Sequence, residues 1–268
     1  QGNQLAIFTD ARELPEELLQ PLAREMNFSE TVFVLPAEQG GHARIRIFTP
    51  TLEMRCAGHP TLGSAFVLAA PLQLDEINLE TKAGVIPVRL EREGPRISFG
   101  WMTQLVPTIK PFAEADALLA ALRVDGSGSE LPIEEYDNGM RFAYVALGSE
   151  EAVARVKPDF ATLADLLGEM GVLVFAGAGA RWKARMFAPA DGVPEDPATG
   201  SAAGPLALHL ARHGRIAFGD EIEISQGAEI GRPSTLFARV EGSPEQVEKV
   251  VVGGSAVTVA RGEFRLPV

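Results

Sequence analysis

The sequence predicts an α+β protein made of two similar halves rather than a doubly wound sheet. Strand patterns outnumber helical ones along the chain, and each half holds one long apolar helix at its centre. The chain also repeats itself, with Pro, Gly, Ser and Ala at the same offsets in His59-Pro60-Thr61-Leu62-Gly63-Ser64-Ala65 and Asp196-Pro197-Ala198-Thr199-Gly200-Ser201-Ala202. Because a duplicated unit gives two copies of one architecture, we expect equivalent loops to face each other across a cleft.

Further matched segments lie upstream of this repeat. The pattern Arg-x-Phe-x-Pro occurs as Arg46, Phe48 and Pro50, and again as Arg185, Phe187 and Pro189. The opening strands match more loosely, as Asn3-Gln4-Leu5-Ala6-Ile7 and Met140-Arg141-Phe142-Ala143-Tyr144. We therefore predict two domains, residues 1–112 and 113–268, with the last strand able to cross back to the first half.

The individual elements follow from the spacing of apolar residues and from runs of β-branched and aromatic residues. In the first half we expect strands at 5–8, 31–34, 44–48, 77–81 and 85–90, and helices at 16–23 and 62–70. A connection bearing Pro107 and Pro111 leads to a helix at 114–122. In the second half we expect a flexible loop at 125–129, strands at 141–147, 172–176, 183–187, 222–225, 235–240 and 256–261, a helix at 160–170, and another helix after Asp196.

Composition and charge exclude several classes of partner. The 268 residues carry a formal net charge of −12, which argues against binding to nucleic acid or to an anionic membrane surface. No apolar run is long enough to span a bilayer. The single cysteine, Cys56, cannot form an intramolecular disulfide, so we expect a cytoplasmic protein. The chain opens without Met in a strand-like run, and we expect a short leading segment to be missing.

The stretch from Glu195 to Gly214 is small and polar in its first half and apolar at helical spacing in its second. A helix that begins near Gly200 presents unpaired backbone N–H groups, which favour an anion such as a substrate carboxylate. Asp196, just upstream, is either a helix cap or a group that holds a substrate amine, hydroxyl or proton. The duplication favours the second interpretation, because the two copies differ at His59 and Asp196.

Three other motifs are weaker. Gly177-Ala178-Gly179-Ala180-Arg181-Trp182 resembles the start of a dinucleotide fingerprint, but Trp182 replaces the third glycine and a strand is expected to follow. His209 and His213 are four residues apart on a helix, but no third metal ligand is evident, and basic groups suit the last turn of a helix. Cys56 fits a packed small side chain better than a nucleophile.

Glu30 is the most informative single residue. It stands between Phe28 and the strand that begins at Thr31. If this end of the strand is buried, desolvation raises the pKa of a carboxyl group towards values that suit proton transfer. The alternative is an exposed loop glutamate.

Five motifs occur in an order that resembles the PhzF-like isomerase family, named for a phenazine biosynthesis enzyme. They span nearly the whole chain, and their combination is far more specific than each motif alone. The motifs are Met26-Asn27-Phe28-Ser29-Glu30-Thr31, Ile47-Phe48-Thr49-Pro50, Ala57-Gly58-His59-Pro60-Thr61-Leu62-Gly63, Asp196-Pro197-Ala198-Thr199-Gly200-Ser201-Ala202 with Gly204, and Gln226-Gly227 with Gly231-Arg232-Pro233-Ser234.

The resemblance implies a diaminopimelate epimerase fold, in which each of two pseudo-symmetric domains is a curved, mostly antiparallel sheet around a central helix. It also implies an active site between the domains, a homodimer, and no metal or cofactor. In the phenazine enzyme a glutamate in the Ser-Glu motif shuttles a proton between substrate carbons, and this role falls on Glu30. Residues that match His59, Asp196 and Ser201 line that pocket.

Backbone N–H groups near Gly58 and Gly200 are expected to bind the substrate carboxylate. Asn3, in a Gly-Asn step that this superfamily carries at the cleft, is a further candidate. Related amino-acid epimerases use two cysteines as base and acid. Here Cys56 lies one residue before the first thiol position, and Thr199 occupies the second. Arg55-Cys56 also replaces the more usual Pro-Phe of the family, which changes the expected pocket wall.

We therefore predict a cofactor-independent isomerase in which Glu30 removes a proton from a small carboxylate-bearing molecule and returns it elsewhere. Two alternatives remain open from the sequence. One is a racemase or epimerase that uses a single base on an amino-acid-like substrate. The other is a small-molecule-binding protein that keeps the cleft without turnover.

Overall fold

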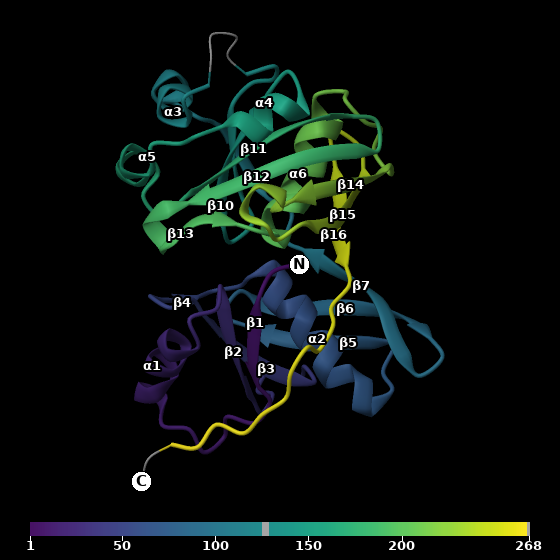
Figure 1. The fold of residues 1–268 in the computed structure, drawn as a ribbon. Helices are drawn as coiled ribbons and strands as arrows, with labels where there is room; N and C mark the ends of the chain where they lie inside the picture. The colour runs from purple at the N-terminus through teal and green to yellow at the C-terminus, as the bar shows by residue number, and fades with distance from the viewer. Residues whose placement is uncertain (125–128, 267–268) are drawn as a thin grey trace.

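The computed structural model describes residues 1–124 and 129–266, which form two lobes stacked one above the other (Figure 1). The N-terminus lies at the junction of the lobes. The predicted loop at 125–129 falls almost wholly outside the described residues. The elements of the first lobe are β1 (Leu5–Phe8), α1 (Glu16–Met26), β2 (Glu30–Leu35), β3 (Ala43–Phe48), β4 (Glu53–Met54), α2 (Gly58–Leu72), β5 (Glu76–Thr81), β6 (Gly84–Glu93) and β7 (Arg96–Gln104).

The second lobe is larger because extra elements precede and interrupt the shared pattern. Its elements are β8 (Thr108–Pro111), α3 (Ala115–Leu122), β9 (Glu134–Asp137), β10 (Arg141–Ala146), α4 (Glu150–Arg155), α5 (Phe160–Leu167), β11 (Gly171–Ala178), β12 (Arg181–Ala188), η1 (Pro189–Asp191), β13 (Val193–Asp196), α6 (Gly200–Arg212), β14 (Glu221–Gln226), η2 (Ala228–Ile230), β15 (Ser234–Gly242) and β16 (Val247–Gly254).

The strand pairings confirm the internal duplication. In the first lobe β1 is parallel to β2, β2 antiparallel to β3, β3 parallel to β5, and β5, β6 and β7 form antiparallel neighbours. In the second lobe β10 to β12 and β14 to β16 repeat this sequence of parallel and antiparallel pairs. The predicted α+β class with two pseudo-symmetric halves is therefore correct.

The two sheets are continuous because the last strands of the two repeats pair with each other. β7 and β16 are antiparallel, with Met102 opposite Val252. Since β7 and β16 hold the same place in their repeats, this pairing sits where a two-fold axis would relate the lobes. The last strand of the chain thus hydrogen-bonds to the first lobe.

One central helix in each lobe is wrapped by its sheet. α6 is buried along almost its whole length, from Ala202 to Ala211, and α2 buries its first turns against the first sheet. Ala and Gly at these positions let the strands approach closely, so that both helices join one apolar core with the inward-facing strand residues. Their N-terminal ends face each other at the junction of the lobes.

The Arg-x-Phe-x-Pro repeat has a structural basis. Arg46 on β3 forms a bidentate ion pair with Glu53, through two contacts of 2.8 Å. Arg185 on β12 forms the same bidentate pair with Glu195, again at 2.8 Å twice. Each guanidinium also lies over the phenylalanine two residues further along, Phe48 or Phe187. The repeated motif therefore fixes the strand that precedes each central helix.

The register of the other repeat differs from the one read from sequence. α2 begins at Gly58 and α6 begins at Gly200, so Gly58 rather than Gly63 corresponds to Gly200. The match between residues 59–65 and 196–202 rested on small residues, which both helices need for close packing. Because such residues recur along α2 and α6, the two segments can be aligned at more than one register. Ala57 and Thr199 are the equivalent residues immediately before the helices.

Several predicted elements need correction at the end of the lobes. β7, β8, β9 and α4 were not expected, and the strand predicted at 256–261 is absent, because the last strand is β16 at Val247–Gly254. Residues 255–266 instead cross the first lobe, where Phe264 meets Phe8 edge-on. The domain boundary at residue 112 remains a prediction; β8, just before it, pairs with β9 of the second lobe.

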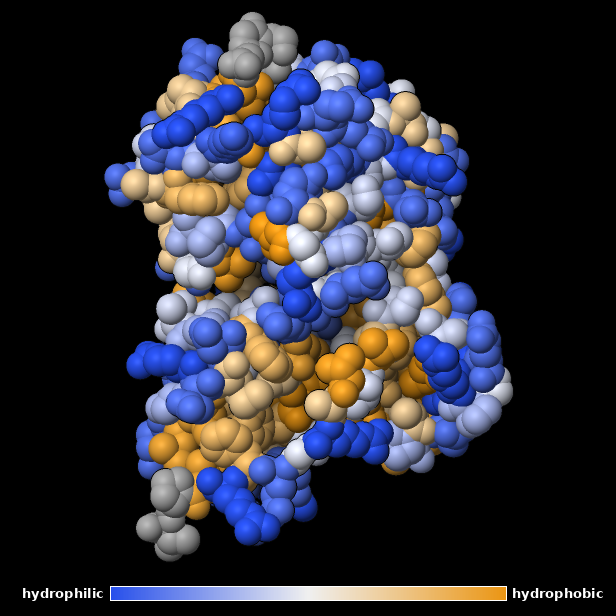
Figure 2. Space-filling view, in the orientation of Figure 1, coloured by the Kyte–Doolittle hydropathy of each residue, from blue (hydrophilic) through white to orange (hydrophobic). Residues whose placement is uncertain are grey.

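The face of the molecule in Figure 2 shows apolar residues gathered on the first lobe on either side of residues 255–266. The second lobe presents a mainly hydrophilic surface in the same view. Within the described ranges, no helix combines the length and apolar character needed to cross a membrane.

Candidate active site

Glu30 is the first residue of β2 and lies at the junction of the lobes. It is only 8% exposed, so the alternative of an exposed loop glutamate is wrong. The burial follows from its place beside Leu5 in the parallel β1–β2 pair, with β-branched and aromatic residues following it. One carboxylate oxygen, Oε2, is buried and has no aligned hydrogen-bond donor among the described residues. This oxygen therefore keeps its lone pairs, and the His59 ring is its polar neighbour.

His59 is the second residue of α2, and its ring lies against Glu30. Its Nε2 atom is 3.0 Å from Glu30 Oε2 and 3.3 Å from the Gln4 carbonyl oxygen. Its Nδ1 atom is 3.1 Å from Asn3 Nδ2. Burial alone would lower the pKa of His59, but the charges of Glu30 and Asp196 outweigh it and raise that pKa.

Asp196 ends β13 and is 5% exposed. Its Oδ1 atom accepts a hydrogen bond from Asn3 Nδ2 at 2.8 Å, and its Oδ2 atom accepts one from Thr199 Oγ1 at 2.6 Å. Burial, followed by the charge of Glu30, raises the pKa of this carboxyl group. Because Thr199 rather than Asp196 is the residue before the helix, the interpretation of Asp196 as a simple helix cap is wrong.

Gly58 and Gly200 bring the starts of the two central helices into backbone contact. A Cβ atom on Gly58 would lie 2.6 Å from the Ser201 nitrogen and 2.7 Å from the Gly200 carbonyl carbon. The unpaired N–H groups of both first turns therefore gather at one place, where both helix dipoles favour an anion. Five of the predicted site residues, Glu30, His59, Asp196, Gly58 and Gly200, thus belong to this junction.

Replacing Gly58 with alanine is expected to disrupt this junction. The added methyl group meets backbone atoms, which cannot rotate away as a flexible side chain could. We expect a loss of several kcal/mol in the free energy of unfolding, by analogy with other overpacked sites, measured by urea denaturation. Gly148→Ala is the control, since its nearest contact is a side-chain atom at 3.5 Å. Equal stability of the two variants would contradict the close contact.

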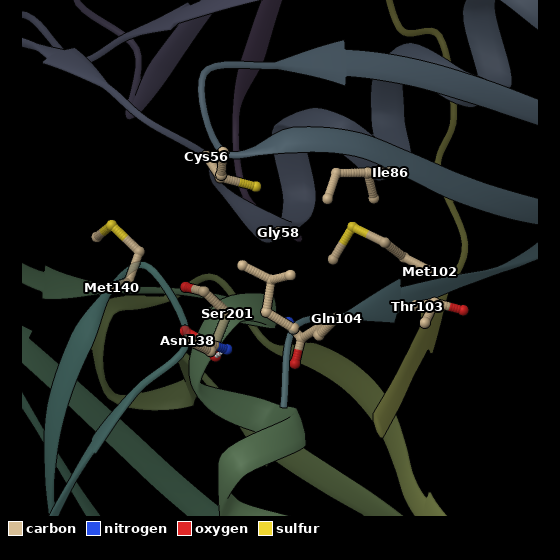
Figure 3. A pocket seen from close by; sticks show the side chains of 11 residues that line it. Cys56, Gly58, Ile86, Met102, Thr103, Gln104, Asn138, Met140 and Ser201 are labelled. Carbon is tan, nitrogen blue, oxygen red and sulfur yellow. Dashed lines mark hydrogen bonds between the residues drawn. The ribbon is translucent and has the colours of Figure 1, made fainter. Parts of the chain in front are cut away.

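Ser201 and Gly58 line a small pocket between the lobes (Figure 3). First-lobe residues Cys56, Ile86 and Met102 lie on one side, and second-lobe residues Ser201, Asn138 and Met140 lie on the other. The pocket therefore has an apolar wall with a few polar groups, the usual composition of a small-molecule site. Glu30, His59 and Asp196 do not line it, so the predicted residues divide between this pocket and the Glu30–His59–Asp196 cluster.

Three side chains that the sequence analysis did not select hold the start of α6. Pro205 has no N–H group, so the carbonyl of Ser201 lacks its usual helical donor. Asn138 Nδ2 donates to that carbonyl at 2.9 Å instead. Gln104 Nε2 donates to the Gly200 carbonyl at 2.9 Å, and Tyr144 OH donates to the Ala202 carbonyl at 2.8 Å. Of these residues, only Pro205 could have pointed to this arrangement from the sequence, because a proline inside a helix leaves one carbonyl group without its usual donor.

Gln226 is a further positioning residue that the sequence identified only within a family motif. Its Nε2 atom donates to the Asp196 carbonyl oxygen at 2.8 Å and to Thr199 Oγ1 at 2.9 Å. The adjacent Gly227 has a positive φ of 80° and packs against the Pro197 backbone. The Gln-Gly pair therefore fixes the segment that carries Asp196.

The two thiol positions of the related epimerases hold no thiol here. They correspond to Ala57 and Thr199, the residues that precede α2 and α6. Cys56 lines the neighbouring pocket, and burial raises the pKa of its thiol. A raised thiol pKa disfavours the thiolate, which is the reactive form of cysteine.

The glycine-rich segment at 177–182 does not form a dinucleotide site. It is the tight turn between antiparallel strands β11 and β12, and Trp182 Nε1 donates to the Gly179 carbonyl at 2.9 Å. The prediction that a strand rather than a helix follows is confirmed. No helix N-terminus is therefore present at this turn to bind a pyrophosphate.

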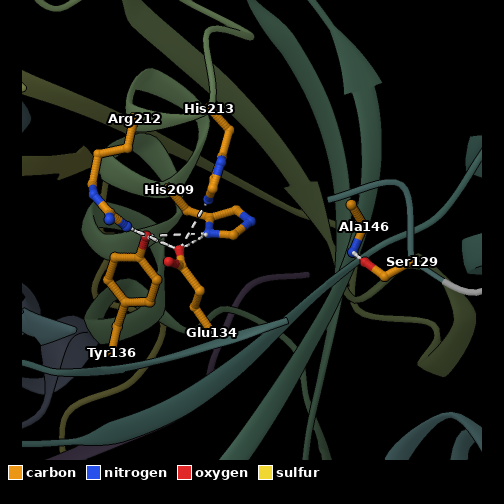
Figure 4. A network of polar contacts seen from close by, with 7 residues as sticks. All are labelled: Ser129, Glu134, Tyr136, Ala146, His209, Arg212 and His213. Atoms are coloured by element: carbon orange, nitrogen blue, oxygen red, sulfur yellow. Dashed lines mark hydrogen bonds and ion pairs between the residues drawn. The ribbon is translucent and has the colours of Figure 1, made fainter. Parts of the chain in front are cut away.

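His209 and His213 converge on a carboxylate that the sequence could not identify (Figure 4). Glu134 Oε2 lies 3.2 Å from His209 Nδ1 and 3.0 Å from His213 Nε2, so Glu134 supplies the third ligand type that was not evident. However, Arg212 Nη1 shares the same oxygen at 2.9 Å, and Tyr136 OH donates to it at 2.9 Å. A guanidinium cation at this distance opposes a metal ion, and a hydrogen-bonded network accounts for the geometry.

This network is expected to make the stability of the folded protein depend on pH in the acidic range. Burial alone would raise the pKa of Glu134, but hydrogen bonds from His209, His213 and Tyr136 outweigh it and hold that pKa below its usual value of 4.5. Because the folded-state pKa is depressed, the stabilisation is present above pH 4.5 and is lost as pH falls through the folded value. We expect Glu134→Gln to lower Tm at pH 7 and to differ less from wild type as the pH falls below 4.5.

Thermal unfolding between pH 7 and pH 3 checks this prediction. The matched control is Glu93→Gln, at an exposed position on β6. A constant difference in Tm between Glu134→Gln and wild type over this range would contradict the proposed role of the carboxylate.

The chain is similar to known proteins along nearly its whole length. The family model for phenazine biosynthesis-like protein (PhzC-PhzF) matches residues 1–262. A trans-2,3-dihydro-3-hydroxyanthranilate isomerase of Pseudomonas aeruginosa is 50% identical over 266 residues, which cover 99% of this chain and 95% of that protein.

Solved structures extend the comparison to the fold. A PhzF family phenazine biosynthesis protein of Bacillus anthracis superposes with a TM-score of 0.85 at 27% identity, covering 99% of this chain and 94% of the other. A probable proline racemase of Agrobacterium radiobacter gives a TM-score of 0.63 at 14% identity, covering 93% and 83% of the two chains. That second likeness concerns the fold alone, and it places the two lobes in the predicted epimerase-type architecture.

Proposed function

The chain belongs to the phenazine biosynthesis-like (PhzC-PhzF) family of isomerases, and from this premise we propose that it moves a hydrogen within a small cyclic carboxylate by acid/base catalysis. The proposed substrate is trans-2,3-dihydro-3-hydroxyanthranilate or a close analogue, because a relative that is 50% identical carries that name. Such a molecule offers a carboxylate, an amine and a hydroxyl group on one ring.

The observation that carries the proposal is the free oxygen of Glu30. This atom is buried, has no aligned donor among the described residues, and lies at the junction of the lobes. In the proposed reaction it takes a proton from a ring C–H, and the electron pair of that bond moves into the conjugated system. The resulting carboxylic acid then returns the proton to a different carbon, so that product and substrate are isomers. Each proton movement uses the chain's own carboxylate, so the proposed reaction requires no cofactor.

The remaining predicted residues suit the binding of the polar substituents. The first-turn N–H groups near Gly58 and Gly200 favour the carboxylate, with Ser201 beside them in the pocket. Asp196, His59 and Asn3 lie together in one polar cluster that suits the amine and hydroxyl groups, and Asn3 Oδ1 has no hydrogen-bond partner among the described residues. The apolar wall of Ile86, Met102 and Met140 suits the ring.

Proton NMR in deuterated water tests the proposed function. Purified protein is incubated with trans-2,3-dihydro-3-hydroxyanthranilate and with a panel of amino and hydroxy acids. We expect conversion of the dihydroanthranilate, with solvent deuterium in part of the product at the carbon that gains hydrogen. Label confined to an unmoved stereocentre of an amino acid would instead indicate the racemase. Tight binding without exchange in any compound would indicate a binding protein.

The homodimer that the resemblance implies and the cytoplasmic location expected from the single cysteine stay predictions. Sedimentation equilibrium of the purified chain checks the first, with a mass of twice 28.6 kDa expected. A monomer at micromolar concentration would contradict it.

A further inference from the structure

The imidazole of His59 is held between two consecutive residues of the N-terminal segment. Asn3 presents its side-chain amide nitrogen to Nδ1 at 3.1 Å, and Gln4 presents its main-chain carbonyl oxygen to Nε2 at 3.3 Å. The ring is therefore contacted on both of its nitrogen atoms at once. Its remaining charged neighbours are two carboxylates, Glu30 on β2 and Asp196 at the end of β13.

These two contacts leave one arrangement of the proton on a neutral ring. An amide nitrogen cannot accept a hydrogen bond, and that of Asn3 already donates to Asp196 Oδ1 and the Ala198 carbonyl. A proton on His59 Nδ1 would therefore face a donor, so Nδ1 carries no proton. A carbonyl oxygen can only accept, so Nε2 must donate and carries the proton. Both contacts thus select the same tautomer of His59, and the two contacts arise from adjacent residues of one strand-leading segment.

Asn3 is itself fixed by the second lobe. Its Nδ2 atom donates to Asp196 Oδ1 at 2.8 Å and contacts the Ala198 carbonyl at 3.2 Å. The preceding Gly2 is held by Arg232, whose Nε atom donates to the Gly2 carbonyl at 2.7 Å. A turned amide would place Asn3 Oδ1 against the Asp196 carboxylate, which like partial charges disfavour. The amide nitrogen therefore faces His59.

We propose that Asn3 is a positioning residue that holds His59 as the neutral, Nε2-protonated tautomer, with the Gln4 carbonyl as its partner. Held in this way, His59 has no free lone pair. Asn3 Oδ1 and Glu30 Oε2 are the oxygens of this cluster without an aligned donor among the described residues, and of these only the carboxylate can act as a base. The functional part of this inference rests on the proposed function, whereas the tautomer can be measured without a substrate.

The opposing effects on His59 make the inference testable. Glu30 and Asp196 favour a protonated imidazolium, whereas the Asn3 amide opposes a proton on Nδ1. Asn3→Asp keeps the size of the side chain and replaces the donor with an acceptor. It should therefore reverse the preference and bring a proton to Nδ1.

The experiment is a long-range proton–nitrogen NMR correlation of protein labelled with 15N-histidine at pH 7. The His59 signals are assigned by their loss in His59→Gln. In wild type we expect His59 protonated at Nε2 and not at Nδ1. In Asn3→Asp we expect a proton on Nδ1, as the other tautomer or as imidazolium, and in Asn3→Ala a mixture of tautomers.

The matched control is Gln226→Ala, which removes another amide bonded to the Asp196 segment but not to His59. We expect it to leave the His59 tautomer unchanged. Wild-type His59 protonated at Nδ1 would overturn the proposal, and so would an unchanged tautomer in folded Asn3→Asp. The wild-type spectrum alone shows whether His59 is protonated at Nδ1 or at Nε2. The proposal can therefore be tested even if a variant fails to fold.

Kinetics supply the second readout. If His59 must be held neutral, Asn3→Ala should lower kcat by up to about 100-fold with a smaller change in KM, and the acid limb of its pH profile should shift to higher pH. A purely structural role would lower the amount of folded protein without moving the pH profile. Absence of turnover in wild type would contradict the proposed function while leaving the tautomer result intact.

Discussion

The Glu30→Gln variant should fold like wild type and lose about 10²–10⁴-fold in kcat, the usual contribution of a positioned acid or base. Glutamine has the shape of glutamate but cannot take up a proton at neutral pH. The buried Oε2 atom of Glu30 has no aligned donor among the described residues, so the substitution removes the charge beside His59 but breaks no aligned hydrogen bond to this atom. We therefore expect KM to change much less than kcat.

Steady-state kinetics with the dihydroanthranilate measure this effect. Glu17→Gln, on the exposed side of α1, is the matched control and should retain wild-type turnover. Turnover of Glu30→Gln within about tenfold of wild type would remove Glu30 from the mechanism, since a positioned base contributes more than that.

The Glu195→Gln variant should show a large loss of stability. Both Arg185 and Glu195 have side chains only 8% exposed. The guanidinium also donates to three main-chain carbonyl groups, those of Val153, Ala154 and Val156. Without the carboxylate, the Arg185 charge stays buried, and breaking such a pair costs about 3–5 kcal/mol.

The first lobe supplies the matched control, because Arg46 and Glu53 form the same bidentate pair. Their side chains are 18% and 15% exposed, and Arg46 also reaches Glu16 at 2.9 Å. We expect Glu53→Gln to lower the free energy of unfolding by clearly less than Glu195→Gln does, as measured by urea denaturation. A larger loss for Glu53→Gln would contradict the view that burial sets the cost.

The sequence predicted the architecture because duplication is visible in residues that the fold itself requires. Arg46 and Arg185 each pair with a glutamate further along the chain, and their spacing to Phe48 and Phe187 survives in both lobes. The register of the helix repeat was wrong because Gly and Ser recur at several offsets within both helices. β7 was missed, although its pairing with β16 joins the lobes, since that contact depends on residues about 150 apart in the chain.

The part of the site that could be predicted from the sequence consists of residues that have suitable side-chain chemistry and also lie in a family motif. Glu30, His59 and Asp196 were expected near one another, and the structure places them in contact or in one polar network with Asn3. The supporting residues Asn138 and Gln104 were not found, because their roles depend on contacts to main-chain atoms 63 and 96 residues away. Nothing in an amide side chain reveals such a distant partner.

Transfer of label within a single molecule tests the central claim most directly. Substrate carrying deuterium at the carbon that loses hydrogen is converted in ordinary water by excess wild-type protein, and the product is analysed by mass spectrometry and NMR. If buried Glu30 both removes and returns the hydrogen, part of the deuterium should appear at the new carbon of the product. Product without any deuterium in a single turnover would contradict direct return of the abstracted hydrogen, because the new hydrogen would then come from water or from a second group.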